Sequence, residues 1–159
     1  MTLRRPTSFN KVRTRFEAPT RHIQPPAFET DVCQMMADRR TFQKVYEKIM
    51  RLWISTRGPV YGLENWEAYS NRVTDGLSRI MATQGSGKTI AVFTSGGPIS
   101  VCVQKALDLS DEKTLELTWQ IMNASVTRLK YSGERLMLAG FNDVTHLEIH
   151  QTSDLITFR

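Results

Sequence analysis

Hydrophobic side chains recur at three- and four-residue spacing over two long stretches of the chain. The first stretch begins near Asp38, and its apolar positions are Phe42, Val45, Tyr46, Ile49, Leu52 and Trp53. The second runs from about Glu64 to Met81, and its apolar positions are Trp66, Tyr69, Val73, Leu77 and Ile80. Such spacing places the apolar side chains on one face of a helix, so two amphipathic helices are predicted. The Gly58-Pro59 pair ends the first of them.

An unbroken apolar run replaces this periodicity at residues 90–93. The run is short and partly β-branched, which is typical of a strand covered on both faces. Two glycines, Gly96 and Gly97, then allow a tight turn, and Pro98 suits the first position of a helix. We therefore predict a buried strand, a turn, and a helix whose inner face carries Ile99, Val103, Ala106 and Leu107.

The rest of the chain predicts a short helix and a β-hairpin. Ser110 is placed to cap the short helix, whose inward positions are Leu115, Trp119 and Met122. Two strands, at about residues 123–131 and 135–141, flank Ser132-Gly133, a pair that favours a hairpin turn. A last short strand is expected at residues 155–158. Helices around a sheet indicate an α/β layered fold, although no strand precedes residues 90–93 to pair with them.

The length and composition of the chain fit one globular domain. The 159 residues contain no apolar run near the roughly 20 residues of a membrane helix, and the N-terminus lacks the apolar core of a secretion signal. Cys33 and Cys102 are too few for a disulfide framework or a zinc site. We therefore expect a cytoplasmic protein with no membrane contact, no metal and no cofactor.

The excess of positive charge is concentrated near the N-terminus. Residues 1–24 hold six Lys and Arg side chains against Glu17 alone, so the net charge of +5 belongs to this segment. Residues 1–31 also contain four prolines and little apolar periodicity. We predict a basic, irregular segment over residues 1–31 and a folded domain over residues 32–159. The segment lacks the interleaved aromatic residues and fold signatures of nucleic-acid binding, so we do not expect nucleic acid as a partner.

The turn after residues 90–93 is the main candidate for a functional site. Ligands of open α/β sheets bind at the carboxyl ends of strands. A helix that begins there presents free N–H groups and the positive end of its dipole. A phosphate-binding site is therefore expected at Thr94, Ser95, Gly96 and Gly97.

Two nearby motifs suggest other chemistry. Residues 85–89, Gly-Ser-Gly-Lys-Thr, suggest a nucleotide-binding P-loop, but Ala82 stands where its first glycine is required, and the run enters a strand instead of a helix. A serine hydrolase would use Ser95 as its nucleophile, with Asp143 and His146. The first glycine of its Gly-x-Ser-x-Gly elbow is missing here. The serine hydrolase is kept as an alternative.

From about Thr41 onward the chain resembles the histidine phosphatase superfamily, also called the phosphoglycerate mutase-like family. The resemblance rests on ordered pieces of sequence: the helix with Phe42 and Trp53, residues 64–73, residues 92–99 (Val-Phe-Thr-Ser-Gly-Gly-Pro-Ile), residues 123–127 (Asn-Ala-Ser-Val-Thr), and residues 141–147. It implies a three-layer α/β/α sandwich. It also implies a phosphomonoester hydrolase or phosphotransfer activity on a phosphate-bearing small molecule.

The chain differs from this family at the positions of the catalytic residues. The family's nucleophile is the His of an Arg-His-Gly motif after the first strand, whereas Arg21-His22 is followed by Ile23 and no apolar strand precedes it. Ser95 stands at the position of the family's second His, and Glu29 is a candidate for the general acid. Without the first strand, the sandwich would be incomplete on its N-terminal side. We therefore expect a truncated chain that is inactive as given.

Two hypotheses follow from the resemblance and its departures. In the first, the chain is the C-terminal portion of a histidine phosphatase, and the phosphate-binding turn at residues 94–97 is the part of the site that remains. In the second, it is a non-catalytic binding or scaffold protein with a degenerate phosphatase fold, whose basic segment contacts a polyanion or a partner protein.

Overall fold

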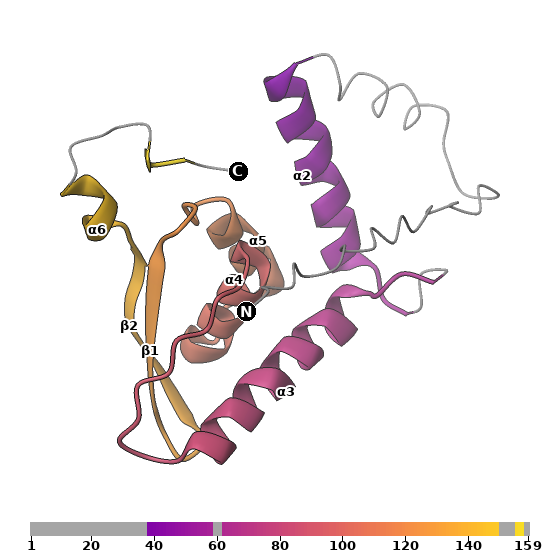
Figure 1. Ribbon diagram of the computed structural model, residues 1–159. Helices are drawn as coiled ribbons and strands as arrows, with labels where there is room; N and C mark the ends of the chain where they lie inside the picture. Colours follow the sequence, from indigo (N-terminus) through magenta and orange to yellow (C-terminus); the bar gives the residue numbers. More distant parts are fainter. Residues whose placement is uncertain (1–37, 59–61, 150–154, 158–159) are drawn as a thin grey trace, which may run out of the picture.

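A computed structural model describes residues 38–58, 62–149 and 155–157 of the chain (Figure 1). The predicted irregular segment at residues 1–31, with Arg21, His22 and Glu29, lies outside the described residues. The elements follow in the order α2 (Arg39–Ser55), α3 (Trp66–Gln84), α4 (Gly96–Leu107), α5 (Asp111–Thr118), β1 (Val126–Ser132), β2 (Arg135–Asp143) and α6 (Thr145–Glu148).

The two predicted amphipathic helices are confirmed as α2 and α3. Each begins at a side chain that accepts a hydrogen bond from the backbone of its first turn, Asp38 in α2 and Asn65 in α3. Helix α3 extends to Gln84, beyond the predicted end at Met81, and stops at Gly85, where φ is +68°. Glycine adopts a positive φ without steric cost, which explains why the helix ends at this residue.

Helices α2 to α5 enclose the main hydrophobic core. The buried side chains Ile54, Trp66, Val101 and Leu115, one from each helix, form its centre. Packed around this centre are Met50, Trp53, Tyr69, Val73 and Trp119. The spacing predicted most of these residues but missed Ile54, Val101 and Met50. The predicted inward positions Leu52 and Leu107 are instead 59% and 51% exposed. Burial of this core is the main source of stability.

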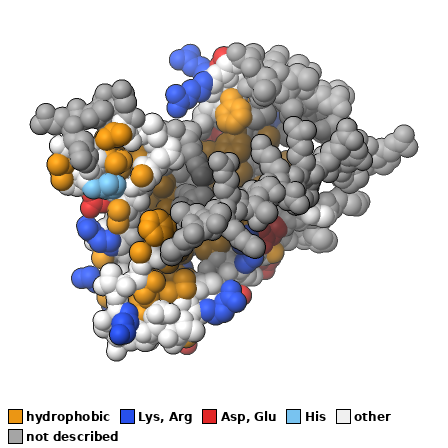
Figure 2. Space-filling model, viewed as in Figure 1, with side chains coloured by type: hydrophobic (Ala, Val, Ile, Leu, Met, Phe, Trp, Pro, Cys, Tyr) orange, Lys and Arg blue, Asp and Glu red, His pale blue; other side chains and the backbone are white. Residues whose placement is uncertain are grey.

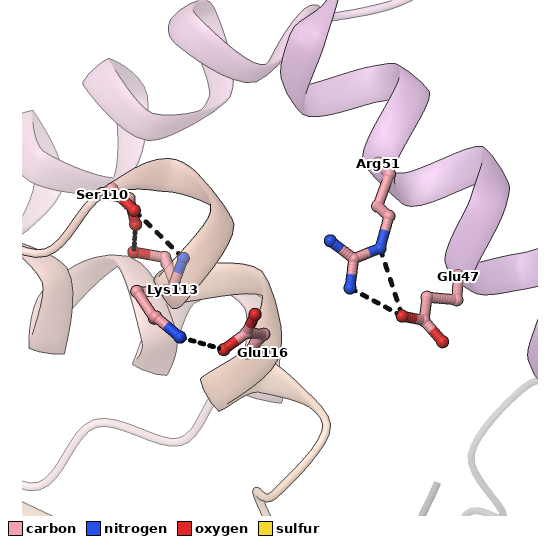
Figure 3. A network of polar contacts seen from close by, with 6 residues as sticks. Glu47, Arg51, Ser110, Lys113 and Glu116 are labelled. Atoms are coloured by element: carbon pink, nitrogen blue, oxygen red, sulfur yellow. Dashed lines mark hydrogen bonds and ion pairs between the residues drawn. The ribbon is translucent and has the colours of Figure 1, made fainter.

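Two exposed ion pairs lie beside each other where α2 faces α5 (Figure 3). Arg51 bonds Glu47 along α2 at 2.8 Å, and Lys113 bonds Glu116 along α5 at 2.7 Å. Because these pairs remain largely exposed to water, their contribution to stability is small.

The sheet consists of an antiparallel hairpin, β1 with β2. Leu129 is paired with Leu138, and Ser132 with Arg135. The turn is therefore Gly133-Glu134, one residue later than the predicted Ser132-Gly133, and Gly133 adopts a φ of +57°. A two-residue hairpin turn needs such positive φ angles, which explains the position of this glycine. The described helices and sheet form an α/β fold, and the three-layer sandwich stays a prediction.

The predicted buried strand at residues 90–93 is wrong. These residues form neither strand nor helix, and the side chains of Val92 and Phe93 are 60% and 96% exposed. An apolar strand is buried only when other strands pair with it and helices cover it, and the described residues provide no strand partner here.

The predicted final strand is also absent from residues 155–157. Thr157 instead accepts a backbone hydrogen bond from Asn123 at 3.0 Å, and its hydroxyl accepts a second from the Asn123 side chain at 2.9 Å. These bonds tie residue 157 to the segment that precedes β1. One such link is too little to form a strand pair, which needs a repeating ladder of backbone bonds.

Candidate functional site

The candidate site is the first turn of helix α4. The helix begins at Gly96, with Ser95 as its N-cap at φ −91° and ψ 171°. Pro98 is therefore the third residue of the helix, and its predicted place at the first position is wrong. A proline is tolerated there because N–H groups of the first turn have no partner within the helix.

Pro98 changes how this helix is capped. In α2, α3 and α5 the N-cap side chain accepts a hydrogen bond from the N–H of the third helical residue, at 2.8 Å from Asp38, 2.8 Å from Asn65 and 3.3 Å from Ser110. The third residue of α4 is Pro98, which has no N–H. Accordingly, the Ser95 side chain makes no capping hydrogen bond.

Several polar groups at the start of α4 make no hydrogen bond that caps the helix. Ser95 and Thr94 are exposed, and the Ser95 carbonyl accepts the N–H of Ile99 at 3.4 Å. The N–H groups of Gly96 and Gly97 have no partner inside the helix. The Ser95 hydroxyl, these two N–H groups and the positive end of the helix dipole can together bind an anion.

The side chain of Tyr69 in α3 packs against the same turn. Its hydroxyl lies so close to Gly97 that a β-carbon on this glycine would be 2.5 Å from the phenolic oxygen. The Tyr69 ring packs against both Trp53 and Trp66, with centroid distances of 5.4 and 5.8 Å, and the Arg72 guanidinium lies 5.3 Å from its centroid. Burial raises the pKa of Tyr69, against a smaller opposing effect of Arg72, so the phenol stays protonated at neutral pH.

The turn opens onto a groove of about 2040 Å³. One wall is the segment of residues 85–96, and the other is strand β1, with the C-terminal half of α3 between them. Ser95 and Gly96 belong to the first wall. His146 of α6 also lines this groove, and it is the one histidine among the described residues.

Ser95, His146 and Asp143 are not joined by hydrogen bonds. The Asp143 carboxylate accepts the backbone N–H of Thr145 at 3.0 Å and a guanidinium N–H of Arg128 at 3.2 Å. The bonds from Thr145, then the charge of Arg128, lower the pKa of Asp143. Because these groups occupy the carboxylate, the hydrogen-bonded chain that activates a catalytic serine is not formed in this structure.

The sequence predicted the turn that opens α4, while the binding role of its residues stays a prediction. The structure brings Thr94, Ser95, Gly96 and Gly97 together at the start of α4, as the glycine-rich turn predicted. Glu29 lies outside the described residues. The described part of the chain contains no cluster of His, Cys, Asp and Glu able to hold a metal ion. The contact between Tyr69 and Gly97 had no sequence signal, since it depends on how α3 packs on α4.

Comparison with protein-family models matches residues 29–144 to the histidine phosphatase superfamily, branch 1. The match covers most of the chain, which therefore belongs to this superfamily. Searches of curated proteins and of solved structures returned no match. Among the described residues, no helix combines the length and the apolar character needed to cross a membrane.

Proposed function

We propose that the chain is a histidine phosphatase-type domain that binds the phosphoryl group of a small molecule at Ser95, Gly96 and Gly97. We further propose that it does not hydrolyse this group. The observation that carries the proposal is Pro98 at the third position of α4. Because Pro98 offers no N–H to the Ser95 hydroxyl, no capping bond fixes the Ser95 side chain, and its O–H can turn to donate to a ligand. Membership of a phosphate-handling superfamily agrees with an anion at this turn.

The free groups suit binding better than catalysis. A hydroxyl and two backbone N–H groups can donate three hydrogen bonds to phosphate oxygens, and donors of this kind form strong bonds with charged acceptors. Phosphoryl transfer also needs a nucleophile and positive charge on the transferring group. Ser95 carries no charge, and the described residues show no histidine bonded to the turn. We therefore assign recognition, not turnover, to this site.

Titration with inorganic phosphate tests the binding site directly. The amide resonances of Gly96 and Gly97 should shift saturably, because their N–H groups would bond the anion. Ser95→Ala should weaken binding about fivefold, the equivalent of one hydrogen bond of about 1 kcal/mol. Ser110→Ala is the matched control, since the Ser110 hydroxyl is already engaged with Lys113 in α5. Shifts at Gly96 and Gly97 that fail to saturate would refute the site.

An aryl phosphate such as p-nitrophenyl phosphate tests the second half of the proposal. The purified chain should release no phosphate above the buffer rate. Robust hydrolysis that disappears in Ser95→Ala would overturn the assignment to binding. A fluorophosphonate probe distinguishes the serine hydrolase alternative, because covalent labelling at Ser95 would require an activated serine that recognition of phosphate does not.

A further inference from the structure

The segment of residues 88–94 forms one wall of the groove. It contains neither helix nor strand, and its backbone forms no hydrogen bond with other described residues. Figure 1 shows it running past β1 between α3 and α4. Its apolar side chains Val92 and Phe93 are exposed to water. A row of unpaired N–H and C=O groups beside exposed apolar side chains is able to pair with another extended chain.

The opposite wall of the groove is strand β1. Strand β1 pairs with β2 on one side, and the described residues place no strand on its other side. The Tyr131 hydroxyl of β1 donates a hydrogen bond of 2.6 Å to the Gly85 carbonyl. A tyrosine side chain therefore spans the gap at this end, and no backbone hydrogen bond joins the two walls among the described residues. The gap leaves room for a polypeptide between them.

Beyond the turn at residues 95–97, the dimensions and lining of the groove favour a polypeptide as its occupant. Its volume of about 2040 Å³ exceeds the roughly 300–1,000 Å³ of typical small-molecule pockets. Apolar side chains from both walls, from α3 and from β2 line it, among them Leu77, Met81, Ile90, Leu129 and Leu136. Figure 2 shows hydrophobic side chains gathered on the face that carries the hairpin, with Lys and Arg beside them. Exposed apolar surface of this kind marks interaction sites.

The charges around the groove specify the partner further. Lys88, Lys105 and Lys130 line it without an ion pair among the described residues, and Arg128 lines it while paired with Asp143. Glu134 is the acidic side chain in the described lining. A basic rim attracts acidic residues and repels basic ones. The strongly basic residues 1–24 of this chain are therefore poorly matched to the groove.

We propose that this groove binds an extended segment of another protein, in which apolar residues alternate with Asp or Glu, as an added strand between residues 88–94 and β1. Main-chain hydrogen bonds to both walls would supply affinity. Alternate apolar side chains would enter the groove, and the acidic ones would meet Lys88 and Lys130 at its rim. This is the strand-addition mode of peptide recognition. It does not depend on whether Ser95 binds phosphate.

A labelled ten-residue peptide of alternating valine and glutamate tests this with the full chain. Its binding, followed by fluorescence anisotropy, should weaken at least tenfold when lysine replaces glutamate. Binding should be lost when proline replaces alternate residues and removes their N–H groups. Phe93→Ser should also weaken binding about tenfold, because Phe93 is 96% exposed and its loss spares the fold. Leu63→Ser, at a side chain 66% exposed outside the groove, is the matched control.

Hydrogen exchange identifies the occupant. The amides of residues 88–94 should exchange freely in the unbound chain and become protected with the acidic peptide. Failure of this peptide to bind would overturn the proposal. Protection of residues 88–94 in the unbound chain at low concentration would overturn it in favour of a segment of this chain. Concentration-dependent association that Phe93→Ser abolishes would overturn it in favour of a second copy.

Discussion

The phenolic oxygen of Tyr69 occupies the space where a side chain at residue 97 would begin, 2.5 Å from the position of a β-carbon on Gly97. The next nearest atom, the ring carbon that bears this oxygen, would be 3.5 Å away. The ring cannot swing aside cheaply, because Trp53 and Trp66 pack against it. Gly97 is thus required for packing at the candidate site, separately from its free N–H.

Gly97→Ala should destabilise the chain by about 1–2 kcal/mol, because the new methyl group overlaps the Tyr69 hydroxyl. Tyr69→Phe removes that oxygen and should rescue the alanine variant. In the Tyr69→Phe background, alanine should be neutral or slightly stabilising, since it favours helix over glycine. Urea unfolding of the four chains measures the coupling. Equal effects of Gly97→Ala in both backgrounds would show that the hydroxyl is not the obstacle.

Asn142 should contribute strongly to the stability of the hairpin. Its side chain accepts the N–H of Met122 at 2.8 Å and donates to the Gln120 carbonyl at 2.6 Å, and its φ is +57°. Asn142→Ala removes both bonds and strains the backbone, so we expect a loss of about 2–4 kcal/mol.

Asn142→Gly separates the two causes, because glycine adopts a positive φ without strain. It should lose about 1 kcal/mol less than the alanine variant. Thermal unfolding measures both variants, and Asn71→Ala on the exposed face of α3 is the control, with an expected change within about 0.5 kcal/mol. A loss as small as that of the control would show that Asn142 does not clamp the residues after α5.

The helices were predictable because their signals are local. Apolar spacing and an N-cap such as Ser110 lie within a few residues of the structure they specify. The prediction of a buried strand at residues 90–93 was wrong because burial of a strand depends on partners elsewhere in the chain. The local sequence has the composition of a buried strand, but it carries no information about whether a neighbour is present.

The candidate site was predictable to the same extent. The Gly-Gly pair indicated a turn that opens a helix, and the structure places the turn there. The free cap was not foreseen, because it depends on the register of the helix: a start at Gly96 makes Pro98 the third residue. The groove could not be predicted, because it depends on where β1 lies relative to residues 85–96, and no residue spacing in the sequence indicates this.

Stability should fall in acid through Glu64. The hydrogen bond from Arg72, with its charge, lowers the pKa of Glu64 below the ordinary 4.5. The unfolded chain then binds more protons than the folded chain between the two pKa values, so this contribution is complete above pH 4.5 and is lost as pH falls through the folded pKa. Glu64→Gln should flatten the dependence of the urea midpoint on pH between 5 and 3. Glu134→Gln, in the hairpin turn, should not, and equal slopes for both variants would contradict the assignment.

Pro98→Ala should close the free cap of α4. Alanine restores an N–H at the third helical position, where Ser95 can accept it as Ser110 does in α5. A bond of this kind contributes about 1 kcal/mol, offset in part by the greater flexibility of the unfolded chain without proline. The decisive measurement is therefore a double-mutant cycle of unfolding free energies. Pro98→Ala should change the free energy of unfolding about 1 kcal/mol more favourably in the parent chain than in the Ser95→Ala background. The same substitution should weaken phosphate binding, because a Ser95 side chain turned toward the N–H of residue 98 no longer points its O–H at the anion. If phosphate binds Pro98→Ala as well as the parent chain, the free cap of α4 does not contribute to the anion site.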